Sequence, residues 1–238
     1  MQEMINKKEF TFTPVAYVRS DFDEKFGIPR QSNLTDAKSE VVFEPEYADE
    51  ESVRRLKSYN YIWLIWVFSE NVDKGWHMTV RPPKLGGNKR VGIWASRSPF
   101  RPNPIGLSCV KLESVDVVQG RVTLYISGAD LMNGTPILDV KPYLAYAESH
   151  PDSTDGFQNE LDHSHLTVED PENLLACYPK AAANALVQIL SEDPRPHYQH
   201  DPDRIYGMKY GGKNVRFRVA GNQLIITAVE NLSSSRSL

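Results

Sequence analysis

Cysteine is scarce in this sequence, and the motifs of the commonest nucleotide-binding and hydrolytic folds do not occur in it. Two cysteines among 238 residues, Cys109 and Cys177, are too few for a disulfide framework or a cysteine-based metal cluster. The patterns GxGxxG, GxxxxGKS/T and GxSxG are all absent. These absences argue against a Rossmann dinucleotide site, a P-loop and an α/β-hydrolase nucleophile.

Long hydrophobic runs are missing as well. The most apolar window, residues 61–68, is far too short to cross a bilayer, and residues 1–8 show no apolar stretch of the kind found in signal peptides. Hydrophobic residues make up 40% and charged residues 24% of the chain, as in ordinary soluble proteins. We therefore expect a cytoplasmic, reduced protein with one large domain or two small ones.

What the sequence does contain is charge of one sign gathered in blocks. Residues 81–101 hold six Lys or Arg and no acid, and residues 204–228 hold five and again no acid, although the net charge of the chain is -4. Residues 148–172 show the opposite pattern, with eight acids and no Lys or Arg. Basic surfaces on an acidic protein predict an anionic partner, above all a nucleic-acid backbone. The alternative is that these side chains are merely solvated.

Prolines stiffen the end of the first basic block. Residues 97–104 read Arg-Ser-Pro-Phe-Arg-Pro-Asn-Pro. Each proline fixes its own φ and biases the residue before it towards extended geometry. Two arginines in a rigid loop are suited to binding phosphate or carboxylate groups at low entropic cost. A proline-rich surface turn is the alternative interpretation.

The first 145 residues are dominated by short β-branched and aromatic segments with turn signals between them. Residues 61–68 suit a strand buried on both faces, and residues 50–57 suit one short helix. This pattern favours a barrel or sandwich over a doubly wound sheet. Further strands are expected at 76–80, 91–95, 105–113, 121–127 and 137–140, with a hairpin that joins 115–118 to 122–126 through Gln119-Gly120.

The character of the sequence changes after residue 147. The acidic stretch 148–172 reads as a linker or an exposed excursion. Pro179 is suited to the first position of a helix. Residues 215–219 alternate as a half-exposed strand would, with Arg216 and Arg218 on one face. These features predict a second, small α+β domain with a basic face of its own.

His163 and His165 place two imidazoles on one face of an extended segment. A structural metal site needs more ligands than two. With no third ligand in view in this acidic stretch, we predict no metal site.

Several runs of sequence are specific enough to indicate a family. These runs are VGIWASRSPFRPNPIGLS at 91–108, FGIPRQ at 26–31, VRPPKLGGN at 80–88 and GTPILDVKPY at 134–143, with DPRP at 193–196, Tyr198, 206–208 and 215–219 in the C-terminal part. Taken together they resemble the TsaA-like family of TrmO-type tRNA methyltransferases. The resemblance covers nearly the whole chain apart from the acidic stretch.

The resemblance implies a mainly β protein, in which a small single-sheet β-barrel binds S-adenosylmethionine without a Rossmann fold. A small α+β domain follows. Residues 8–147 would form the barrel, 148–172 the acidic linker and 173–232 a tRNA-binding domain. Members of the family usually work as homodimers. They methylate N6 of adenosine 37, next to the anticodon, when that base already carries a threonylcarbamoyl group in threonine tRNAs.

A site for this cofactor needs a cation, a flat apolar slot and carbonyl or carboxylate oxygens, because S-adenosylmethionine carries a carboxylate, an adenine and a sulfonium. Arg30 and Arg97 are the natural partners for anionic groups. Asn133 stands where the family often has Asp, a change that a backbone contact would survive. The cofactor-binding residues implied by the resemblance are Pro29, Arg30, Gln31, Ser69, Glu70, Arg97, Leu107, Asp130, Leu131, Met132 and Asn133.

Methyl transfer needs an in-line approach of N6 to the methyl group, and positioning supplies much of the rate. A threonylcarbamoyl nitrogen is acylated and a poor nucleophile, so loss of its proton helps, and Asp139 or the phenol of Tyr143 is the candidate acceptor. The alternative for both is a strand end with an ordinary ion pair and a packed tyrosine. Arg101 and Lys141 are expected to bind the substrate; solvated surface charge is the alternative.

Recognition of an anticodon loop uses basic side chains on phosphates and aromatic rings that stack on unpaired bases. The two basic blocks supply the first, and Phe100, Tyr198, Tyr206 and Tyr210 are candidates for the second, although aromatics are more often core residues. In the C-terminal domain the expected substrate-binding residues are Arg195, Tyr198, Tyr206, Arg216 and Arg218.

Two other functions remain open from the sequence. The same barrel could methylate a different RNA or a small molecule, and the basic C-terminal domain speaks against a small molecule. A non-catalytic protein that binds RNA or senses S-adenosylmethionine is the other alternative. Turnover of S-adenosylmethionine in the presence of tRNA separates this alternative from the enzymes.

Overall fold

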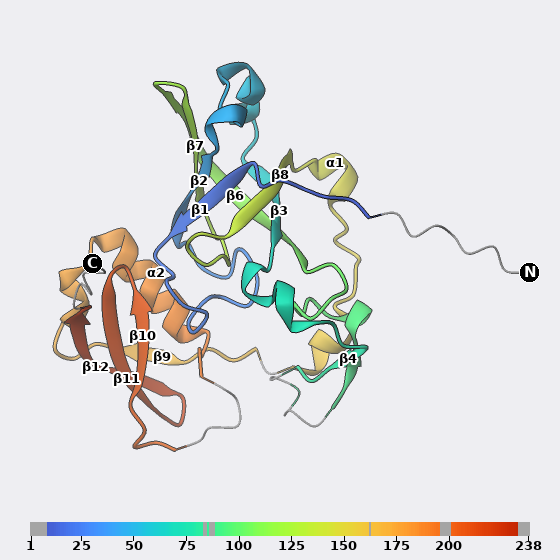
Figure 1. The fold of residues 1–238 in the computed structure, drawn as a ribbon. Helices are drawn as coiled ribbons and strands as arrows, with labels where there is room; N and C mark the ends of the chain where they lie inside the picture. The colour runs from blue at the N-terminus through green and yellow to red at the C-terminus, as the bar shows by residue number, and fades with distance from the viewer. Residues whose placement is uncertain (1–8, 83–84, 86–88, 162, 196–200, 233–238) are drawn as a thin grey trace, which may run out of the picture.

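Six antiparallel strands close into a barrel in the order β1-β2-β7-β6-β3-β8, as Figure 1 shows. The computed structural model describes residues 9–82, 85, 89–161, 163–195 and 201–232. The expected mainly β fold with a single-sheet barrel is confirmed. The barrel strands are β1 (Ala16–Ser20), β2 (Lys38–Phe43), β3 (Tyr61–Val67), β6 (Ile105–Val118), β7 (Arg121–Ser127) and β8 (Pro136–Pro142).

The barrel interior is filled by every second side chain of its strands. On β3, Ile62, Leu64 and Trp66 are buried and join the barrel core, while the residues between them are only half-buried. The expectation that this strand is buried on both faces is therefore wrong. A barrel strand has one face in the core and one on the outside, and bulky β-branched residues suit both.

Several expected elements are shorter or of a different type. The helix expected at 50–57 is instead two 3₁₀ turns, η2 (Glu50–Val53) and η3 (Leu56–Ser58), separated by Arg55 with φ 70°. A non-glycine residue in the left-handed region ends a helical run. The strand expected at 105–113 and the first arm of the 115–118 hairpin form one long strand, β6, with a register shift between Leu112 and Ser114.

The described part of the first basic block lies beside the barrel, around a small two-stranded sheet. Strands β4 (Thr79–Val80) and β5 (Val91–Gly92) pair with each other alone, and the 3₁₀ turn η6 (Ile93–Ala95) replaces the rest of the strand expected at 91–95. The remaining short elements are η1 (Pro45–Tyr47), η4 (Ser69–Lys74), α1 (Ala145–Glu148), η7 (Gly156–Glu160) and η8 (Leu174–Cys177).

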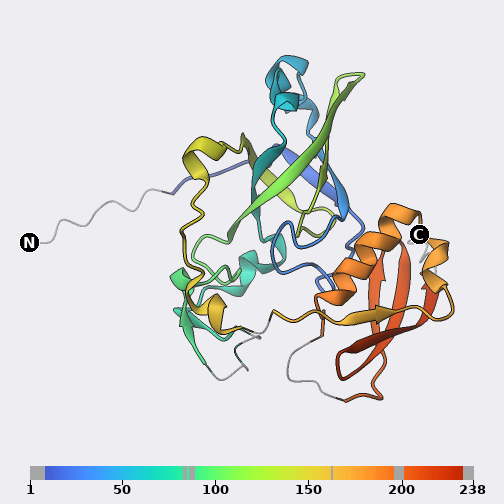
Figure 2. The ribbon, with the colours of Figure 1, turned by 180° about the vertical axis from the view of Figure 1, so that it is seen from behind.

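The C-terminal part is a four-stranded sheet with one helix packed against it. The sheet has the order β10-β11-β12-β9, and Figure 2 shows helix α2 (Lys180–Ser191) lying across one face. Pro179 is the N-cap of this helix. The strands are β9 (Thr167–Glu169), β10 (Tyr206–Tyr210), β11 (Lys213–Ala220) and β12 (Gln223–Asn231). Strand β9 lies within the stretch 148–172 expected to be a linker, yet it pairs in parallel with β12.

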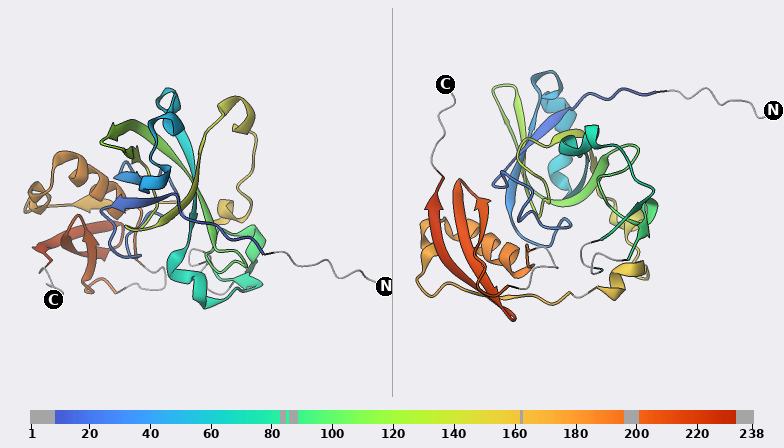
Figure 3. Two further views of the ribbon diagram at one scale, coloured as in Figure 1. Left: turned by 45° about the horizontal axis from the view of Figure 1, so that its top comes forward. Right: turned by 60° about the horizontal axis from the view of Figure 1, so that its bottom comes forward.

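The barrel and the C-terminal sheet lie side by side, and the views in Figure 3 agree on this. The segment 21–37, which joins β1 to β2, runs between them. Phe22 and Ala37 of this segment are buried in the core of the C-terminal sheet rather than in the barrel core. The two parts therefore share apolar contacts in addition to the chain that connects them.

Candidate functional site

One end of the barrel carries a pocket of about 460 Å³. Three connections meet there: the segment between β1 and β2, the segment from the end of β3 to the start of β6, and the segment between β7 and β8. Small-molecule sites usually have volumes of about 300–1,000 Å³ and mostly apolar walls with a few polar groups. The pocket therefore has the size and position of a small-molecule site.

Ten of the eleven residues expected to bind a cofactor line this pocket. The exception is Asn133, whose side-chain oxygen accepts a hydrogen bond from the backbone N–H of Ser20 (3.3 Å) outside the pocket lining. The ten are Pro29, Arg30, Gln31, Ser69, Glu70, Arg97, Leu107, Asp130, Leu131 and Met132.

A chain of hydrogen bonds fixes a carboxylate in the pocket wall. The indole N–H of Trp66 donates to Ser108 Oγ (3.0 Å), and Ser108 Oγ donates to Asp130 Oδ1 (2.6 Å). Burial raises the pKa of Asp130, while the Ser108 hydrogen bond and the charge of Arg97 partly oppose the rise. Asp130 is thus an acid that the protein holds in place at an electrostatic cost.

Arg97 and Arg101 share the pocket lining with this carboxylate. Arg97 donates from its Nη1 to Gln31 Oε1 (2.6 Å), which ties the proline-rich loop to the segment between β1 and β2. Arg101, expected to bind substrate, also lines the pocket and donates to the carbonyls of Ile93 and Ser96. Its guanidinium lies 5.2 Å from the centre of the Trp94 ring. The pocket therefore combines fixed positive charge with one buried carboxylate.

Sequence reasoning missed the apolar and amide part of the lining. Trp66 and Phe68 lie at the end of β3, with 4.2 Å between their ring centres. Ile28, from the segment between β1 and β2, also lines the pocket. Lys25 donates to Asn71 Oδ1 (3.0 Å) across the pocket edge. The signal that could have found them is their position: Ile28 lies within the run at 26–31 and Lys25 directly before it, while Phe68 and Asn71 flank Ser69 and Glu70.

Gly106 has to be glycine because Trp66 lies against it. A Cβ built on Gly106 would lie 2.2 Å from the Trp66 ring, in a wall of the pocket. We expect Gly106→Ala to push the indole aside and to lower the free energy of unfolding by about 1–3 kcal/mol. Chemical denaturation followed by tryptophan fluorescence measures this. Gly92→Ala, where a Cβ meets nothing within 4 Å, is the matched control and should be nearly neutral.

The two residues expected to act in catalysis lie outside the pocket lining. Asp139 and Lys141 form an ion pair on β8 (2.7 Å). Tyr143 packs edge-on against Tyr61 (6.4 Å between ring centres) and lies 6.0 Å from the Trp63 ring. Both residues thus have the contacts of the alternative interpretation, an ordinary ion pair for Asp139 and a packed ring for Tyr143.

The C-terminal residues expected to bind substrate differ in their accessibility. Arg195 is half-buried and makes two hydrogen bonds to the carboxylate of Asp193 (2.8 and 2.9 Å). Tyr206 is buried and stacks on Phe217, so it offers no open face to a base. Tyr210 is buried too. Tyr198 lies outside the described residues.

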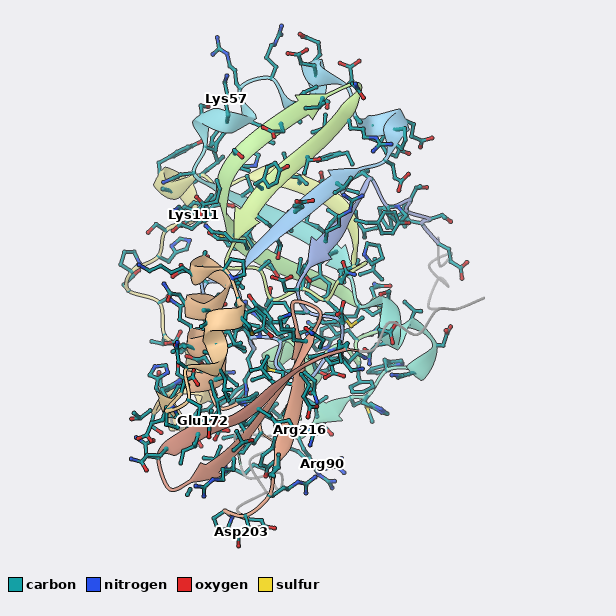
Figure 4. All side chains as sticks on the ribbon, turned by 90° about the vertical axis from the view of Figure 1, so that its left-hand side faces the viewer. Lys57, Arg90, Lys111, Glu172, Asp203 and Arg216 are labelled. Carbon is teal, nitrogen blue, oxygen red and sulfur yellow. The ribbon has the colours of Figure 1, made fainter. Side chains whose placement is uncertain are left out.

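Arg90 of the first basic block and Arg216 of the second lie in the same half of the molecule. Arg216 and Arg218 are exposed on β11, and Arg216 pairs with Glu230 (3.1 Å). In Figure 4, Arg216 and Arg90 are both in the lower half of the view, whereas Lys57 is at the opposite end. Phe100 is half-buried, with its ring 5.2 Å from that of His77.

No helix within the described residues is long and apolar enough to cross a membrane. In the same part of the chain, no group of three His, Cys, Asp or Glu side chains is arranged to hold a metal ion. His165 pairs with Glu192 (3.0 Å), and His163 contacts the carbonyl of Gln158 (3.0 Å). Both histidines thus have local protein partners.

Comparison with known proteins gives consistent matches along the chain. Residues 17–149 match the family model of the tRNA-methyltransferase O N-terminal domain, and residues 162–232 match that of the TrmO C-terminal domain. The tRNA (adenine(37)-N6)-methyltransferase of Escherichia coli strain K12 is 36% identical over 231 residues, which are 93% of this chain and 98% of that protein.

Two further similarities concern the ligand and the fold. The S-adenosyl-L-methionine-binding protein of Archaeoglobus fulgidus is 34% identical over 131 residues, which are 55% of this chain and 86% of that protein. The crystal structure of TrmO from Pseudomonas aeruginosa superposes with a TM-score of 0.77 at 29% identity. That superposition covers 96% of this chain and 100% of the other.

Proposed function

Because this chain belongs to the TrmO family of tRNA methyltransferases, we propose that it methylates N6 of adenosine 37 in tRNA with S-adenosylmethionine as methyl donor. The substrate base is the threonylcarbamoyl-modified adenosine of threonine tRNAs. The barrel, residues 8–147, holds the cofactor. The C-terminal domain, residues 173–232 together with β9, binds the tRNA, and two copies of the chain form the working dimer.

The pocket at the barrel end is the observation that carries this proposal. Its residues fit the cofactor group by group, since Arg97 and Arg30 suit the carboxylate, and the exposed Leu107 side chain with the backbone of residues 130–132 suits the adenine. The buried carboxylate of Asp130 suits a cationic ligand, because a nearby positive charge offsets the cost of keeping that acid ionised. S-adenosylmethionine, when bound, supplies a methyl group activated by its positive sulfur.

The strand pairing supports a role for Asp139 beside the pocket, outside its lining. Leu107, which lines the pocket, pairs with Ile65, and Ile65 pairs with Asp139 across β6, β3 and β8. Neighbouring strands are about 4.8 Å apart, so Asp139 is about two strand spacings from Leu107 on the outer face. We assign to Asp139 the acceptance of the N6 proton, with Tyr143 beside it as the alternative acceptor.

Basic residues supply binding to the tRNA backbone. Arg101 of the pocket lining and Lys141, which lies on β8 outside the lining, hold the modified nucleotide. Arg216 and Arg218 on β11 contact phosphates farther along the anticodon arm, and Arg195, fixed by Asp193, adds a rigid guanidinium. Each of these contacts weakens as the salt concentration rises.

Methyl transfer from labelled S-adenosylmethionine to two bulk tRNA preparations tests the proposed function. One preparation comes from cells that make the threonylcarbamoyl modification and the other from cells that cannot. Label in threonine tRNA from the first preparation alone is the expected result. If neither preparation is labelled although S-adenosylmethionine binds measurably, tRNA is not the substrate, and the barrel acts on a different one. Sedimentation of the purified chain tests the dimer.

Replacing Arg97 by alanine should weaken S-adenosylmethionine binding by about tenfold to a hundredfold, because a hydrogen bond to a charged group contributes about 1.5–3 kcal/mol. The change also releases Gln31, its partner at 2.6 Å. Isothermal titration calorimetry measures the Kd. Arg97→Lys keeps the charge but not the planar fork, and it should recover only part of the affinity. An unchanged Kd in Arg97→Ala would remove Arg97 from the cofactor site.

A further inference from the structure

The segment 21–37 contributes residues both to the pocket at the barrel end and to the core of the C-terminal sheet. Five of its residues line the pocket at the barrel end. The same segment supplies side chains to the C-terminal core. The pocket-lining residues of this segment are Lys25, Ile28, Pro29, Arg30 and Gln31.

Apolar contacts bind this segment to the C-terminal sheet. Phe22 is 1% exposed, and its ring meets that of Tyr210 edge-on at 5.5 Å. Phe26 and Ile28 are partly buried and pack against the same core. Ile28 therefore has one contact region in the pocket lining and another in the C-terminal core.

Hydrogen bonds at both ends of the segment add to these contacts. The N–H of Gly211 donates to the carbonyl of Asp21 (3.1 Å). At the other end, Gln188 of α2 accepts from the N–H of Asp36 (2.7 Å) and donates to its carboxylate (2.8 Å). Polar pairs of this kind set the distance between two units more narrowly than apolar packing does.

Gly27 lies tightly against Met208. Gly27 is buried with φ +93°, and a Cβ built on it would overlap the sulfur of Met208. Met208 is fully buried on β10, so its side chain has little room to move away. Gly27 is followed directly by Ile28, Pro29 and Arg30 of the pocket wall.

We propose that the C-terminal sheet of this chain sets the position of the pocket-lining segment, with Met208 against Gly27 as the positioning contact. The affinity for S-adenosylmethionine then depends on a residue of the tRNA-binding domain that does not line the pocket. This inference rests on the proposed cofactor. It makes the C-terminal domain part of the cofactor site as well as part of the substrate site.

Binding of S-adenosylmethionine to Gly27→Ala tests the inference. We expect the Kd, measured by calorimetry on the full chain well below its melting temperature, to rise by about tenfold or more. Gly120→Ala is the matched control, since Gly120 also has positive φ (+72°) but a Cβ there meets nothing within 4 Å. The control should bind within about twofold of wild type. An unchanged Kd in Gly27→Ala would overturn the inference.

The double variant Gly27→Ala/Met208→Ala separates the contact from backbone strain. Removing the thioether makes room for the new methyl group, so the double variant should regain at least about fivefold of the lost affinity. An equal loss in the single and double variants would mean that strain at Gly27, and not the sheet, moves the segment; that result overturns the inference. Wild-type protein that binds no S-adenosylmethionine at all would instead contradict the proposed function.

Gln188→Ala tests the positioning of the segment a second time, without a change in a hydrophobic core. Gln188 is half-buried on α2, and its loss removes both hydrogen bonds to Asp36. We expect the Kd to rise by about two- to fivefold while far-UV circular dichroism stays unchanged. A purely structural role would lower the melting temperature and leave the Kd at wild-type level, which counts against positioning.

Discussion

Replacing Asp139 by asparagine should slow methyl transfer by about a hundredfold or more while S-adenosylmethionine binds as before. General acid–base groups contribute about 10²–10⁴-fold to rates. Asparagine keeps an oxygen that can accept a hydrogen bond from N6 but is not basic enough to take its proton. Single-turnover transfer to modified threonine tRNA measures the rate, and calorimetry measures the Kd.

Asp139→Asn also breaks the ion pair with Lys141, so a control must separate loss of the pair from loss of the carboxylate. The pair is 2.7 Å long, but both side chains are about half exposed, and exposed pairs contribute about 0–1 kcal/mol to stability. Lys141→Gln breaks the same pair and leaves the carboxylate, so it should bind tRNA less well and keep most of the single-turnover rate. Glu40→Gln removes an exposed, paired carboxylate of β2 and should change neither quantity. A rate within about threefold of wild type for Asp139→Asn would exclude this residue as the acceptor.

Strands were predictable wherever local chemistry decides the conformation. The alternation in 121–127 and the Gln119-Gly120 turn predicted β7 with the bounds it has. Val53 and Leu56 had helical spacing, but Arg55 between them takes φ 70° and divides the segment. Long-range packing sets that backbone angle, and a periodicity in one short window does not contain it.

The pocket was predictable only in part, for a related reason. Arginines in a proline-rich loop show their chemistry in the sequence itself. The hydrogen-bond chain from Trp66 through Ser108 to Asp130 joins residues that are 42 and 22 positions apart, and it exists because β3 and β6 pair in one register. Tyr206 shows the opposite error, since an aromatic residue beside basic ones looked like a stacking surface and is a core residue.

Replacing Asp130 by asparagine should have opposite effects on stability and on cofactor binding. Burial raises the pKa of this carboxyl above its ordinary value of 3.8, so the folded protein binds a proton more tightly than the unfolded chain does. Stability from this group is complete at pH values below 3.8 and is lost as the pH rises through the raised pKa. Asparagine does not ionise, so the variant escapes this loss.

At pH 7, Asp130→Asn should therefore have a higher melting temperature than the wild-type protein. The expected rise is about 2–4 °C for each kcal/mol that the ionised, poorly solvated carboxylate takes from the free energy of unfolding. The gap should close as the pH is lowered below 3.8, where the wild-type carboxyl is protonated in both states. Thermal unfolding of ligand-free protein across this pH range measures the effect. Asp116→Asn, which changes an exposed carboxylate of β6, should show no gap that depends on pH.

The same substitution should weaken S-adenosylmethionine binding by about thirtyfold or more, because loss of one member of a buried charge pair costs about 2–5 kcal/mol. In the proposed complex the positive charge of the ligand offsets the cost of an ionised Asp130, whose Oδ1 accepts a hydrogen bond from Ser108 (2.6 Å). A variant that is both more stable and unable to bind would identify Asp130 as a group kept for function at the expense of the ligand-free fold. A variant that binds normally would mean that the carboxylate faces no positive charge of the cofactor.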